Sequence, residues 1–437
     1  MKQNAEFPRV LVISNNCFSK TDSNGRTLGN FFVGWPKDRL AQFYIQNASP
    51  DFEVCENYFR VTDGQAVKAL LGKAAGGRVT PDMVPASAAT SSAAATKKRN
   101  RNALTMMVRN LVWNLGAWKK SGFDVWVADF APEAVLLQAG DNSFMFALAR
   151  KTASRYGVPL LIYNSEGYYF KDFDYFRSKG LAHWCYPVFR WGFCREFRRT
   201  QRHTAHNVYI CDSLKAAYDA EFDTPSTALY TATELKPFAP KVGGDGFTAS
   251  YLGNFGFHRY EALVEVAEIL QSLSPDYYLD VYGILPNDTV RTAFEGCKGI
   301  RYNGFLDYEG VTRVMQGSDL LIHVEKDTPF NRETLRFGFS TKIADSLACG
   351  RCFLLYAPET VECYRYVAQN ALAYAVNTEE GLRETLRLLA QDATAREKYL
   401  ANAQQAARER HSMEKNREAF AGIMKETVGD TDEGATN

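Results

Sequence analysis

The residues best suited to chemistry stand at the start of a predicted helix near position 340. Ser340, Thr341 and Lys342 open this helix, and Asp345 and Gly350 follow. Hydroxyl residues at a helix start and Gly just past its end are both typical caps. Free N–H groups, the helix macrodipole and a lysine together favour a phosphate. Asp345 shares a helix face with Thr341 and Lys342, and its carboxylate suits sugar hydroxyls. This pattern describes a nucleotide-sugar site, although an ordinary capped helix carries the same residue types.

The surrounding sequence alternates apolar runs with helical segments, which predicts parallel sheets covered by helices. A polar loop, CFSKTDSNGRTLGN, follows the first strand and precedes a helix that we expect to begin near Phe31. The strands expected in the first half are Arg9–Asn15, Phe43–Ile45, Phe52–Tyr58, Val125–Phe130, Pro159–Tyr163 and Val208–Cys211. Those expected in the second half are Thr248–Leu252, Tyr278–Tyr282, Ile300–Tyr302, Leu320–Val324 and Phe353–Tyr356. The fold class is therefore α/β, with two Rossmann-like parallel-sheet domains facing a cleft.

A Pro- and Gly-rich segment, Pro237–Gly246, is the best candidate for a linker between the two domains. We expect an amino-terminal acceptor domain over 1–240 and a nucleotide-sugar donor domain over 248–410. An Ala-, Ser-, Thr- and Gly-rich stretch, about 74–102, predicts a long mobile loop. A helix over 411–427 is expected to cross back to the first domain, and 428–437 to form a disordered tail.

The composition of the chain argues against a nucleic-acid-binding, membrane-spanning or disulfide-rich protein. The chain has 437 residues and a formal net charge of +1, which excludes strong global steering toward nucleic acid. No run approaches the ~20 apolar residues of a membrane span, and the start has no signal-peptide core. Nine scattered cysteines fit a reducing cytoplasm, and we interpret the close pair Cys349 and Cys352 as packing residues. The sequence thus predicts a cytoplasmic protein that does not bind nucleic acid.

Four segments in order resemble the nucleotide-binding domain of GT-B glycosyltransferases, especially the retaining family 4, or group 1, type. YLGNFGFHRYEALVEV is similar to the opening strand–turn–helix of that domain, with Gly253, Asn254 and Arg259. VYG, with Gly283, is similar to the end of its next strand. NGFLDYEGVTRVMQGSDLLIH, with Phe305, and STKIADSLACG resemble its later motifs. The resemblance covers the chain from about Thr248 to the final helix.

The resemblance implies roles for these residues. Lys342, Arg259 and the N–H groups of residues 340–342 would stabilise the charge that develops on the leaving phosphate. Asp345 would accept hydrogen bonds from the ribose, and the backbone near Phe305 would meet the base. Gly253 would let the chain approach the donor closely. The donor-binding residues expected in this half are Gly253, Asn254, Gly283, Phe305, Ser340, Thr341, Lys342 and Asp345.

One departure from the retaining pattern concerns its paired glutamates. Asp345 stands in place of the second, and Phe337 stands in place of the first. Glu325 or Glu333 could supply the missing carboxylate, and His258 could contact a phosphate or a sugar hydroxyl. The departure leaves both retaining and inverting outcomes open.

The first half should hold the acceptor. Gly25, in the loop after the first strand, is expected to approach the donor phosphates. Glu166 follows a strand and is a candidate to orient or deprotonate an acceptor hydroxyl, with Asp129 and Asp141 as weaker candidates. The Asp172–Asp174 pair has the Asp-x-Asp pattern of metal-dependent transferases but lies in an aromatic loop. We therefore expect neither a metal nor a cofactor, and the absence of G-x-G-x-x-G after the first strand disfavours an NAD enzyme.

The stretch from residue 175 to 206 is rich in aromatic residues and carries seven Lys and Arg against one acid, Glu196. It fits a buried acceptor wall or a peripheral membrane surface, and RNA binding is a weaker alternative. The resemblance implies transfer of a sugar from a nucleotide-diphosphate donor to a glycan or lipid-linked acceptor. Bacterial surface polysaccharide synthesis, at the inner face of the cell membrane, is the expected setting. A nucleotide-sugar epimerase or hydrolase and a non-catalytic nucleotide-sugar-binding scaffold are the alternatives.

Overall fold

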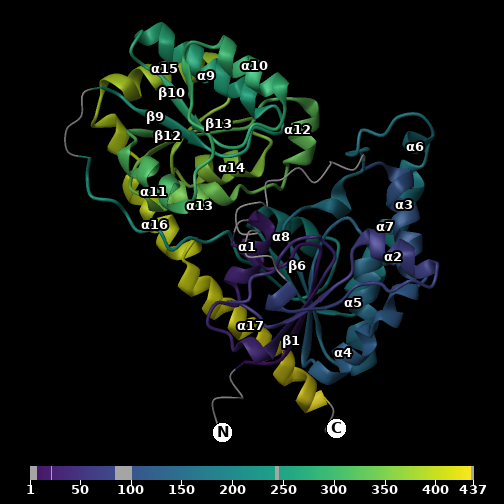
Figure 1. The fold of residues 1–437 in the computed structure, drawn as a ribbon. Coiled ribbons are helices and arrows are strands. Elements are labelled where there is room, and N and C mark those ends of the chain that lie inside the picture. The colour runs from purple at the N-terminus through teal and green to yellow at the C-terminus, as the bar shows by residue number, and fades with distance from the viewer. Residues whose placement is uncertain (1–6, 21, 84–100, 242–245, 435–437) are drawn as a thin grey trace. The chain divides into compact units, whose positions relative to one another are not determined.

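The computed structural model describes residues 7–20, 22–83, 101–241 and 246–434 (Figure 1). The chain forms two compact units. Unit 1 comprises Met1–Tyr230 and Asn416–Asn437, and unit 2 comprises Thr231–Lys415. The carboxyl-terminal residues therefore belong to the same unit as the amino terminus.

Unit 1 is built on an eight-stranded sheet with the order β4-β3-β2-β1-β5-β6-β7-β8. Neighbouring strands are parallel except for β4, which pairs with β3 in the antiparallel sense. The strands are β1 (Val10–Ser14), β2 (Leu40–Tyr44), β3 (Asn57–Arg60), β4 (Gly77–Val79), β5 (Ala134–Gln138), β6 (Leu160–Asn164), β7 (Thr204–Tyr209) and β8 (Ser226–Ala228). The helices are α1 (Ser23–Asn30), α2 (Asp63–Leu70), α3 (Ala103–Asn114), α4 (Phe123–Phe130), α5 (Ser143–Tyr156), α6 (Leu181–Trp184), α7 (Tyr186–Gln201) and α8 (Asp212–Asp219).

Strands β1, β2, β5 and β6 are buried along their whole length, which explains their nearly continuous apolar sequences. Helices cover both faces of a parallel sheet, so neither face of these strands meets water. The prediction of a parallel α/β sheet here is confirmed.

Four local predictions in unit 1 are wrong. The strand expected at Phe52–Tyr58 begins only at Asn57, where β3 starts. Val125–Phe130 is not a strand but lies in helix α4, and the strand follows at Ala134. The expected polar loop after β1 contains helix α1, whose first turn is capped by the Asp22 carboxylate accepting from Gly25 N–H. The expected mobile loop over 74–102 contains strand β4, and its residues 84–100 lie outside the described residues.

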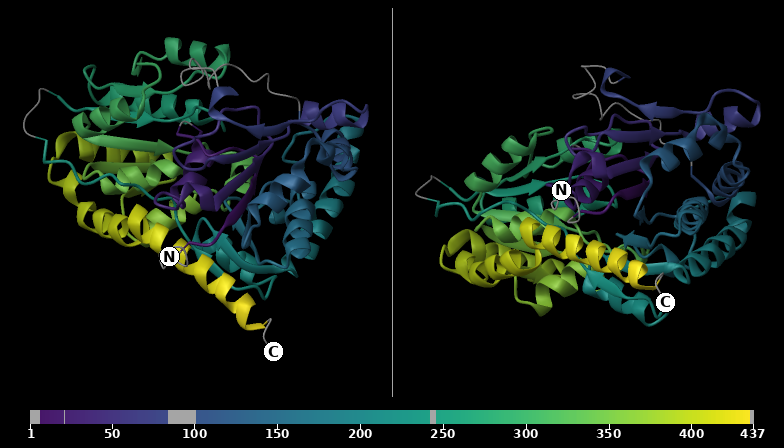
Figure 2. Two further views of the ribbon diagram at one scale, coloured as in Figure 1. Left: turned by 60° about the horizontal axis from the view of Figure 1, so that its bottom comes forward. Right: turned by 90° about the horizontal axis from the view of Figure 1, so that it is seen from below.

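Helix α17 (Met413–Gly434) packs on unit 1 through its apolar side. The Phe420 ring stacks on Phe31, with 4.7 Å between ring centroids, and meets Phe32 edge-on at 5.3 Å. Figures 1 and 2 show this helix beside the amino-terminal strands of unit 1. The prediction of a disordered tail from residue 428 is wrong as far as Gly434, and residues 435–437 lie outside the description.

Unit 2 has a six-stranded, fully parallel sheet with the order β11-β10-β9-β12-β13-β14. Its strands are β9 (Ala249–Leu252), β10 (Leu279–Tyr282), β11 (Ile300–Tyr302), β12 (Leu320–Val324), β13 (Cys352–Tyr356) and β14 (Tyr374–Val376). Its helices are α9 (Arg259–Leu273), α10 (Asp288–Gly296), α11 (Tyr308–Gly317), α12 (Pro329–Thr334), α13 (Thr341–Ala348), α14 (Glu362–Gln369), α15 (Glu379–Gln391) and α16 (Leu400–Arg410).

The strand order of unit 2 reverses between β9 and β12, which follow one another in the sheet but not in the chain. Open parallel sheets bind ligands outside the carboxyl ends of their strands at such a switch point. The segments that follow β9, β10 and β12 are therefore the ones in which to look for a site.

Candidate functional site

Two glycines bring the ends of β9 and β10 into close contact. Gly253 follows β9 and Gly283 follows β10, and Gly253 N–H donates to the Tyr282 carbonyl at 2.9 Å. A Cβ atom on Gly283 would lie 2.0 Å from the Gly253 carbonyl oxygen. Gly283 N–H in turn donates to the Gly304 carbonyl at 2.8 Å, which places the loop before Phe305 beside this pair. The surface at the carboxyl ends of β9 and β10 is thus formed by backbone atoms rather than by side chains.

Lys342 is the second residue of α13 and extends over Gly253. A Cβ atom on Gly253 would lie 2.7 Å from Cε and 3.2 Å from Nζ of Lys342. The ammonium group is thereby placed at the carboxyl end of β9, at the switch point. Ser340 precedes the helix with extended backbone, but its side chain makes no capping hydrogen bond to the helix, unlike the predicted cap.

Arg259, the first residue of α9, is buried in a hydrogen-bond network. Its Nε and Nη2 donate to Oε2 and Oε1 of Glu325 at 2.9 and 2.5 Å, and Nη1 donates to Asn254 Oδ1 at 2.5 Å. His323 Nε2 donates to the same Glu325 carboxylate at 3.1 Å. Both Arg259 and Glu325 are more than nine-tenths buried. The guanidinium that was expected to contact phosphate is therefore engaged by protein groups through all three of its nitrogens.

The ion pair between Arg259 and Glu325 determines the protonation states in this network. Burial alone would raise the pKa of Glu325, but Arg259 and the His323 hydrogen bond hold it below its ordinary value. Burial would lower the pKa of Arg259, and the facing carboxylate more than offsets this. Burial lowers the pKa of His323 despite the bond to Glu325, so its imidazole is neutral. The network holds one compensated ion pair below the edge of the sheet.

The loop from Gly253 to His258 is fixed at several points. Tyr251 Oη donates to the Asn254 carbonyl at 2.5 Å, and Asn331 Nδ2 donates to the Phe257 carbonyl at 2.7 Å. Phe257 and His258 both have left-handed backbone, with φ of 56° and 58°, which is costly outside glycine. His258 Nδ1 lies 2.7 Å from Glu261 Oε1. Such a loop is held in one conformation before any ligand arrives.

The other predicted residues of unit 2 are more exposed. Phe305 is 69% exposed after β11, Asp345 is partly buried on α13, and Glu333 is exposed on α12. The structure thus brings together Gly253, Asn254, Arg259, Gly283, Glu325 and Lys342. Sequence reasoning missed His323 and Asn331, and no local motif marks either of them.

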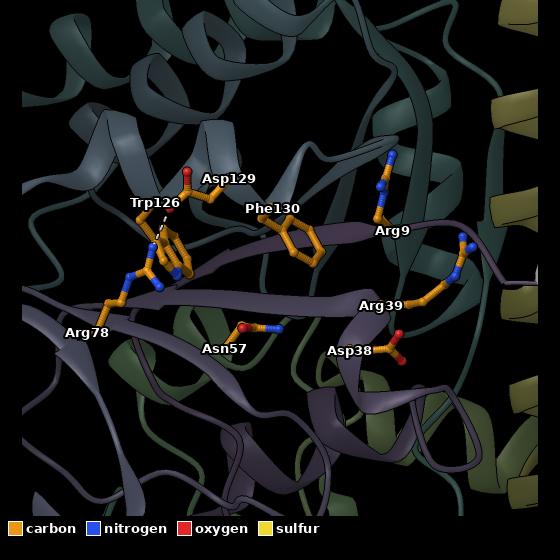
Figure 3. Close-up of a pocket in the computed structure, with 8 residues that line it drawn as sticks. All are labelled: Arg9, Asp38, Arg39, Asn57, Arg78, Trp126, Asp129 and Phe130. Atoms are coloured by element: carbon orange, nitrogen blue, oxygen red, sulfur yellow. Dashed lines mark hydrogen bonds and ion pairs between the residues drawn. The ribbon is translucent and has the colours of Figure 1, made fainter.

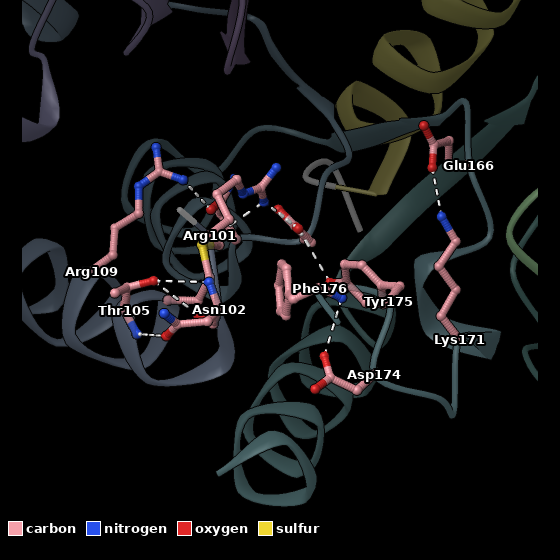
Figure 4. Close-up of polar contacts among 12 residues, drawn as sticks. Arg101, Asn102, Thr105, Arg109, Glu166, Lys171, Asp174, Tyr175 and Phe176 are labelled. Atoms are coloured by element: carbon pink, nitrogen blue, oxygen red, sulfur yellow. Dashed lines mark hydrogen bonds and ion pairs between the residues drawn. The ribbon is translucent and has the colours of Figure 1, made fainter. Parts of the chain in front are cut away.

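In unit 1, Glu166 follows β6 and forms an ion pair with Lys171, with 2.7 Å between Oε2 and Nζ (Figure 4). Lys171 is buried and lies over the Tyr168 ring, 4.3 Å from its centroid. Tyr175 Oη donates to Asp141 Oδ2 at 3.2 Å, and Arg101 forms an ion pair with the same carboxylate. These groups form a charged cluster, Arg101, Asp141, Glu166, Lys171 and Tyr175, after the carboxyl ends of β5 and β6. Sequence reasoning missed Lys171 and Arg101.

Gly25 and the second aspartate of the Asp-x-Asp pair, Asp174, contribute to local packing and backbone hydrogen bonding. A Cβ atom on Gly25 would lie 2.2 Å from the Cys17 carbonyl oxygen, so Gly25 lets helix α1 pack on the chain after β1. Asp174 accepts hydrogen bonds from the backbone N–H groups of Phe176 and Ser178. Within the described ranges, no group of three or more His, Cys, Asp or Glu residues is arranged to hold a metal ion.

A pocket of about 350 Å³ lies at the opposite, amino-terminal edge of the unit 1 sheet (Figure 3). Arg9, Arg39 and Asn57 line it from the starts of β1, β2 and β3. Arg78 and Asp129 form an ion pair across its other end, at 2.5 Å. This pocket also shows that Asp129, a weaker acceptor candidate, lies away from the strand ends that carry Glu166.

Comparison with known proteins shows the fold and gives a family match over part of the chain. Residues 261–421 match the family described as glycosyl transferase-like. No curated protein matches the sequence. Sucrose-phosphate synthase from Thermosynechococcus elongatus superposes with a TM-score of 0.64 at 10% identity, over 96% of this chain and 99% of that one. Anabaena HepE in complex with UDP gives 0.62 at 10% identity, over 96% and 100% of the two chains.

The lipopolysaccharide outer core galactosyltransferase WaaB gives a TM-score of 0.55 at 11% identity, over 95% of this chain and 99% of that one. At these sequence identities the structural similarity shows the fold alone. The family match applies to residues 261–421. The predicted fold class is confirmed, and the family match confirms the predicted glycosyltransferase resemblance over residues 261–421. The chain has the GT-B fold, and its residues 261–421 match the glycosyl transferase-like family.

Proposed function

We propose that this protein transfers a sugar from a nucleoside-diphosphate donor, with UDP as the carrier, to a glycan or lipid-linked acceptor. The observation that carries this proposal is the position of Lys342 over Gly253, at the switch point of the unit 2 sheet. The family match supports the class of reaction, and the Anabaena HepE complexes with UDP and UDP-glucose support the choice of carrier.

In this proposal the leaving diphosphate receives its compensating charge from the protein. As the bond to the anomeric carbon breaks, negative charge develops on the diphosphate. Lys342 Nζ and the first N–H groups of α13 are fixed donors that stabilise this charge. Asp345 accepts from the ribose, and the backbone around Gly304 and Phe305 meets the base. We propose that transfer proceeds without a divalent ion, because these donors do the work that a metal does in other transferases.

Arg259 acts in this proposal as a positioning residue. It holds Asn254 through Nη1 while Glu325 holds its other two nitrogens. The loop that carries Gly253 is thereby kept in the conformation that receives Lys342. In this proposal Glu325 holds the Arg259 guanidinium in place and does not bind the sugar.

The acceptor is proposed to bind at the carboxyl edge of the unit 1 sheet. Glu166 is 46% exposed on its side chain while its partner Lys171 is buried, so the carboxylate is both fixed and accessible. It can accept the proton of an attacking hydroxyl or orient that hydroxyl. A lipid-linked glycan acceptor would place the enzyme at the cytoplasmic face of the membrane, in surface polysaccharide synthesis.

A thermal-shift panel with UDP, GDP, ADP and CMP, with and without Mg²⁺, tests the donor site. A ligand at a hundred times its dissociation constant stabilises the folded state by about 2.7 kcal/mol, which is a readable shift. We expect UDP alone to raise the melting temperature, and Mg²⁺ to leave the shift unchanged. A shift with another nucleotide would change the carrier, and no shift with any of them would contradict the donor site.

A second candidate is a non-catalytic protein that binds a nucleotide sugar. It is favoured by the burial of Glu325 in its ion pair and by Phe337 at the position of the missing glutamate. Release of UDP from UDP-sugars discriminates the two. Release that depends on an added acceptor supports transfer, release without acceptor supports a hydrolase, and binding without release supports the scaffold.

A further inference from the structure

One face of α6 and α7 exposes a stripe of large apolar side chains, which we name the α6–α7 stripe. Its members are Leu181, Trp184, Val188 and Trp191, with 72%, 79%, 55% and 63% of their surface exposed. They are spaced three, four and three residues apart, which places them on one side of consecutive helical turns. The opposite side of α7 is buried through Tyr186, Phe189, Phe193 and Phe197. Apolar residues thus occupy both sides of this segment, although only one side is needed for packing.

A second stripe follows the neighbouring helix α3, and we name it the α3 stripe. Leu104, Val108, Leu111 and Leu115 are exposed at spacings of four, three and four. The other side of α3 packs on α7, where Ala103 and Met106 meet Tyr186 and Phe189. Figure 1 shows α3, α6 and α7 side by side in unit 1. Single exposed apolar residues are ordinary, but eight in two stripes on adjoining helices mark an interaction surface.

The charges beside the α6–α7 stripe are almost all positive. Arg177 and Lys179 precede it, and Arg195, Arg199 and Arg202 follow on exposed positions of and after α7. The Arg195 guanidinium lies 5.3 Å from the Trp191 ring centroid. The one acid of the segment, Glu196, faces inward to Arg150 at 2.8 Å. The surface therefore combines exposed tryptophans with exposed cations.

We propose that the α3 and α6–α7 stripes form a docking surface for a lipid bilayer that contains anionic lipids. Tryptophan and aliphatic side chains enter the boundary between headgroups and acyl chains, while arginines pair with lipid phosphates. A second copy of this chain fits less well, because an isologous contact would bring these same cations against one another. Nucleic acid would leave the apolar stripes without a partner. Among the described residues, no helix is long and apolar enough to cross a membrane, so this contact is peripheral.

This inference deepens the proposed function, since it rests on a lipid-linked acceptor for its purpose, but the docking itself needs neither donor nor acceptor. Binding to vesicles can thus fail while transfer to a soluble acceptor succeeds, and the reverse is also distinguishable. The two proposals are tested by separate measurements.

The tryptophans provide a built-in probe. Of the six in the chain, Trp35, Trp113, Trp118 and Trp126 are each at most 5% exposed, and only Trp184 and Trp191 are open to solvent. Titration with vesicles of phosphatidylcholine containing about 30 mol % phosphatidylglycerol should shift the emission of these two to the blue. Vesicles of phosphatidylcholine alone should give much weaker binding, and added salt should weaken binding to the anionic vesicles.

Two variants identify the contact by vesicle flotation. Trp184→Ser with Trp191→Ser should raise the apparent dissociation constant about ten-fold or more, because these rings are the largest apolar side chains of the two stripes. Leu111→Glu with Leu115→Glu should do the same from α3. Leu388→Glu, which changes an exposed leucine of unit 2, is the matched control and should bind as the unchanged chain does.

Each outcome decides the proposal. Loss of vesicle binding in both stripe variants, with UDP affinity and melting temperature unchanged, supports it. No binding of the unchanged chain to anionic vesicles, or equal binding by the stripe variants, overturns it. Self-association of the unchanged chain in sedimentation that the stripe variants abolish, without vesicle binding, would assign the surface to a second copy instead.

Discussion

Arg259 and Glu325 form a two-pronged ion pair, 2.9 Å from Nε to Oε2 and 2.5 Å from Nη2 to Oε1, although 66 positions separate them in the chain. The pair joins the start of α9 to the end of β12, on the two sides of the switch point of the unit 2 sheet. Its geometry makes the guanidinium a support for the loop above it, and Lys342 is the cation that we propose contacts the donor.

Removing one charge of this pair should destabilise unit 2 strongly. Glu325→Gln leaves Arg259 buried without a counter-charge, and we expect a loss of about 3–5 kcal/mol in the free energy of unfolding. Urea unfolding measures it. The control is Glu261→Gln, which removes a half-buried carboxylate beside His258 and should cost less than about 1 kcal/mol. Equal, small losses in both variants would show that the buried pair is not a structural support.

Substitution of Gly253 should affect donor binding more than folding. In Gly253→Ala the new methyl group would lie 2.7 Å from Lys342 Cε and 2.9 Å from Tyr251 Oη, so the flexible lysine must move away from the edge of the sheet and the tyrosine hydroxyl must shift slightly. We expect UDP affinity to fall about ten-fold, with a smaller loss of melting temperature from the contact with the Tyr251 hydroxyl. Gly256→Ala is the matched control, because its Cβ would meet only Asn254 Oδ1, at 3.6 Å. Unchanged UDP affinity in Gly253→Ala would separate Lys342 from the donor.

Strand β4 makes Gly76 a structural position. Gly76 has φ of +67°, and a Cβ atom there would lie 2.1 Å from the Arg60 carbonyl oxygen of β3. Gly76→Ala should therefore lower the free energy of unfolding by more than the ~1–2 kcal/mol of left-handed strain. Gly72→Ala isolates that strain, since Gly72 has φ of +73° and nothing within 4 Å of its Cβ. Equal losses from the two variants in urea unfolding would mean that β4 is not closely packed on β3.

His411 should make the stability of unit 2 depend on pH. It is fully buried, its Nδ1 donates to the Thr231 carbonyl at 2.7 Å, and its Nε2 accepts from Tyr366 Oη at 2.8 Å. Burial lowers its pKa to about 4. Because the unfolded state binds a proton below about pH 6.5 and the folded state does not, this histidine destabilises the fold progressively as pH falls from 6.5 to about 4.

The total effect approaches about 3 kcal/mol at pH 4, since one pKa unit corresponds to about 1.4 kcal/mol. His411→Gln keeps a donor and an acceptor without a titrating group. We expect the difference in unfolding free energy between pH 7 and pH 4.5 to be smaller in this variant than in the unchanged chain. His203→Gln, at an exposed histidine, should leave that difference as it is. If the two variants show the same pH dependence, the buried histidine is not its source.

The sequence predicted the strands of both sheets best where they are fully buried, as in β1 and β12, because an uninterrupted apolar run has few other uses. It misplaced α4 because Phe123, Trp126 and Val127 bury one side of a short helix whose composition also suits a strand. Helix α1 was missed because Gly and Asn in SNGRTLGN favour loops, and its cap at Asp22 outweighs that preference.

In the candidate site, too, the sequence predicted local motifs but not the contacts that depend on tertiary packing. Motif resemblance located Gly253, Asn254, Arg259, Gly283 and Lys342 on segments that the fold brings together. It could not foresee that Arg259 is engaged by Glu325 and His323, because that contact depends on the packing of β12 against β9. The buried partner of Glu166, Lys171, was likewise hidden in an aromatic loop with no recognisable pattern.

The most direct test of the donor site is the affinity of UDP for the Lys342→Ala variant, measured by isothermal titration calorimetry. Loss of one charge-assisted contact of about 1.5–3 kcal/mol should weaken binding roughly 10- to 150-fold. Lys298→Ala removes the same charge from an exposed position of unit 2 and should leave binding unchanged. Equal UDP affinity in Lys342→Ala, Lys298→Ala and the unchanged chain would contradict the assignment of this edge of the sheet as the donor site.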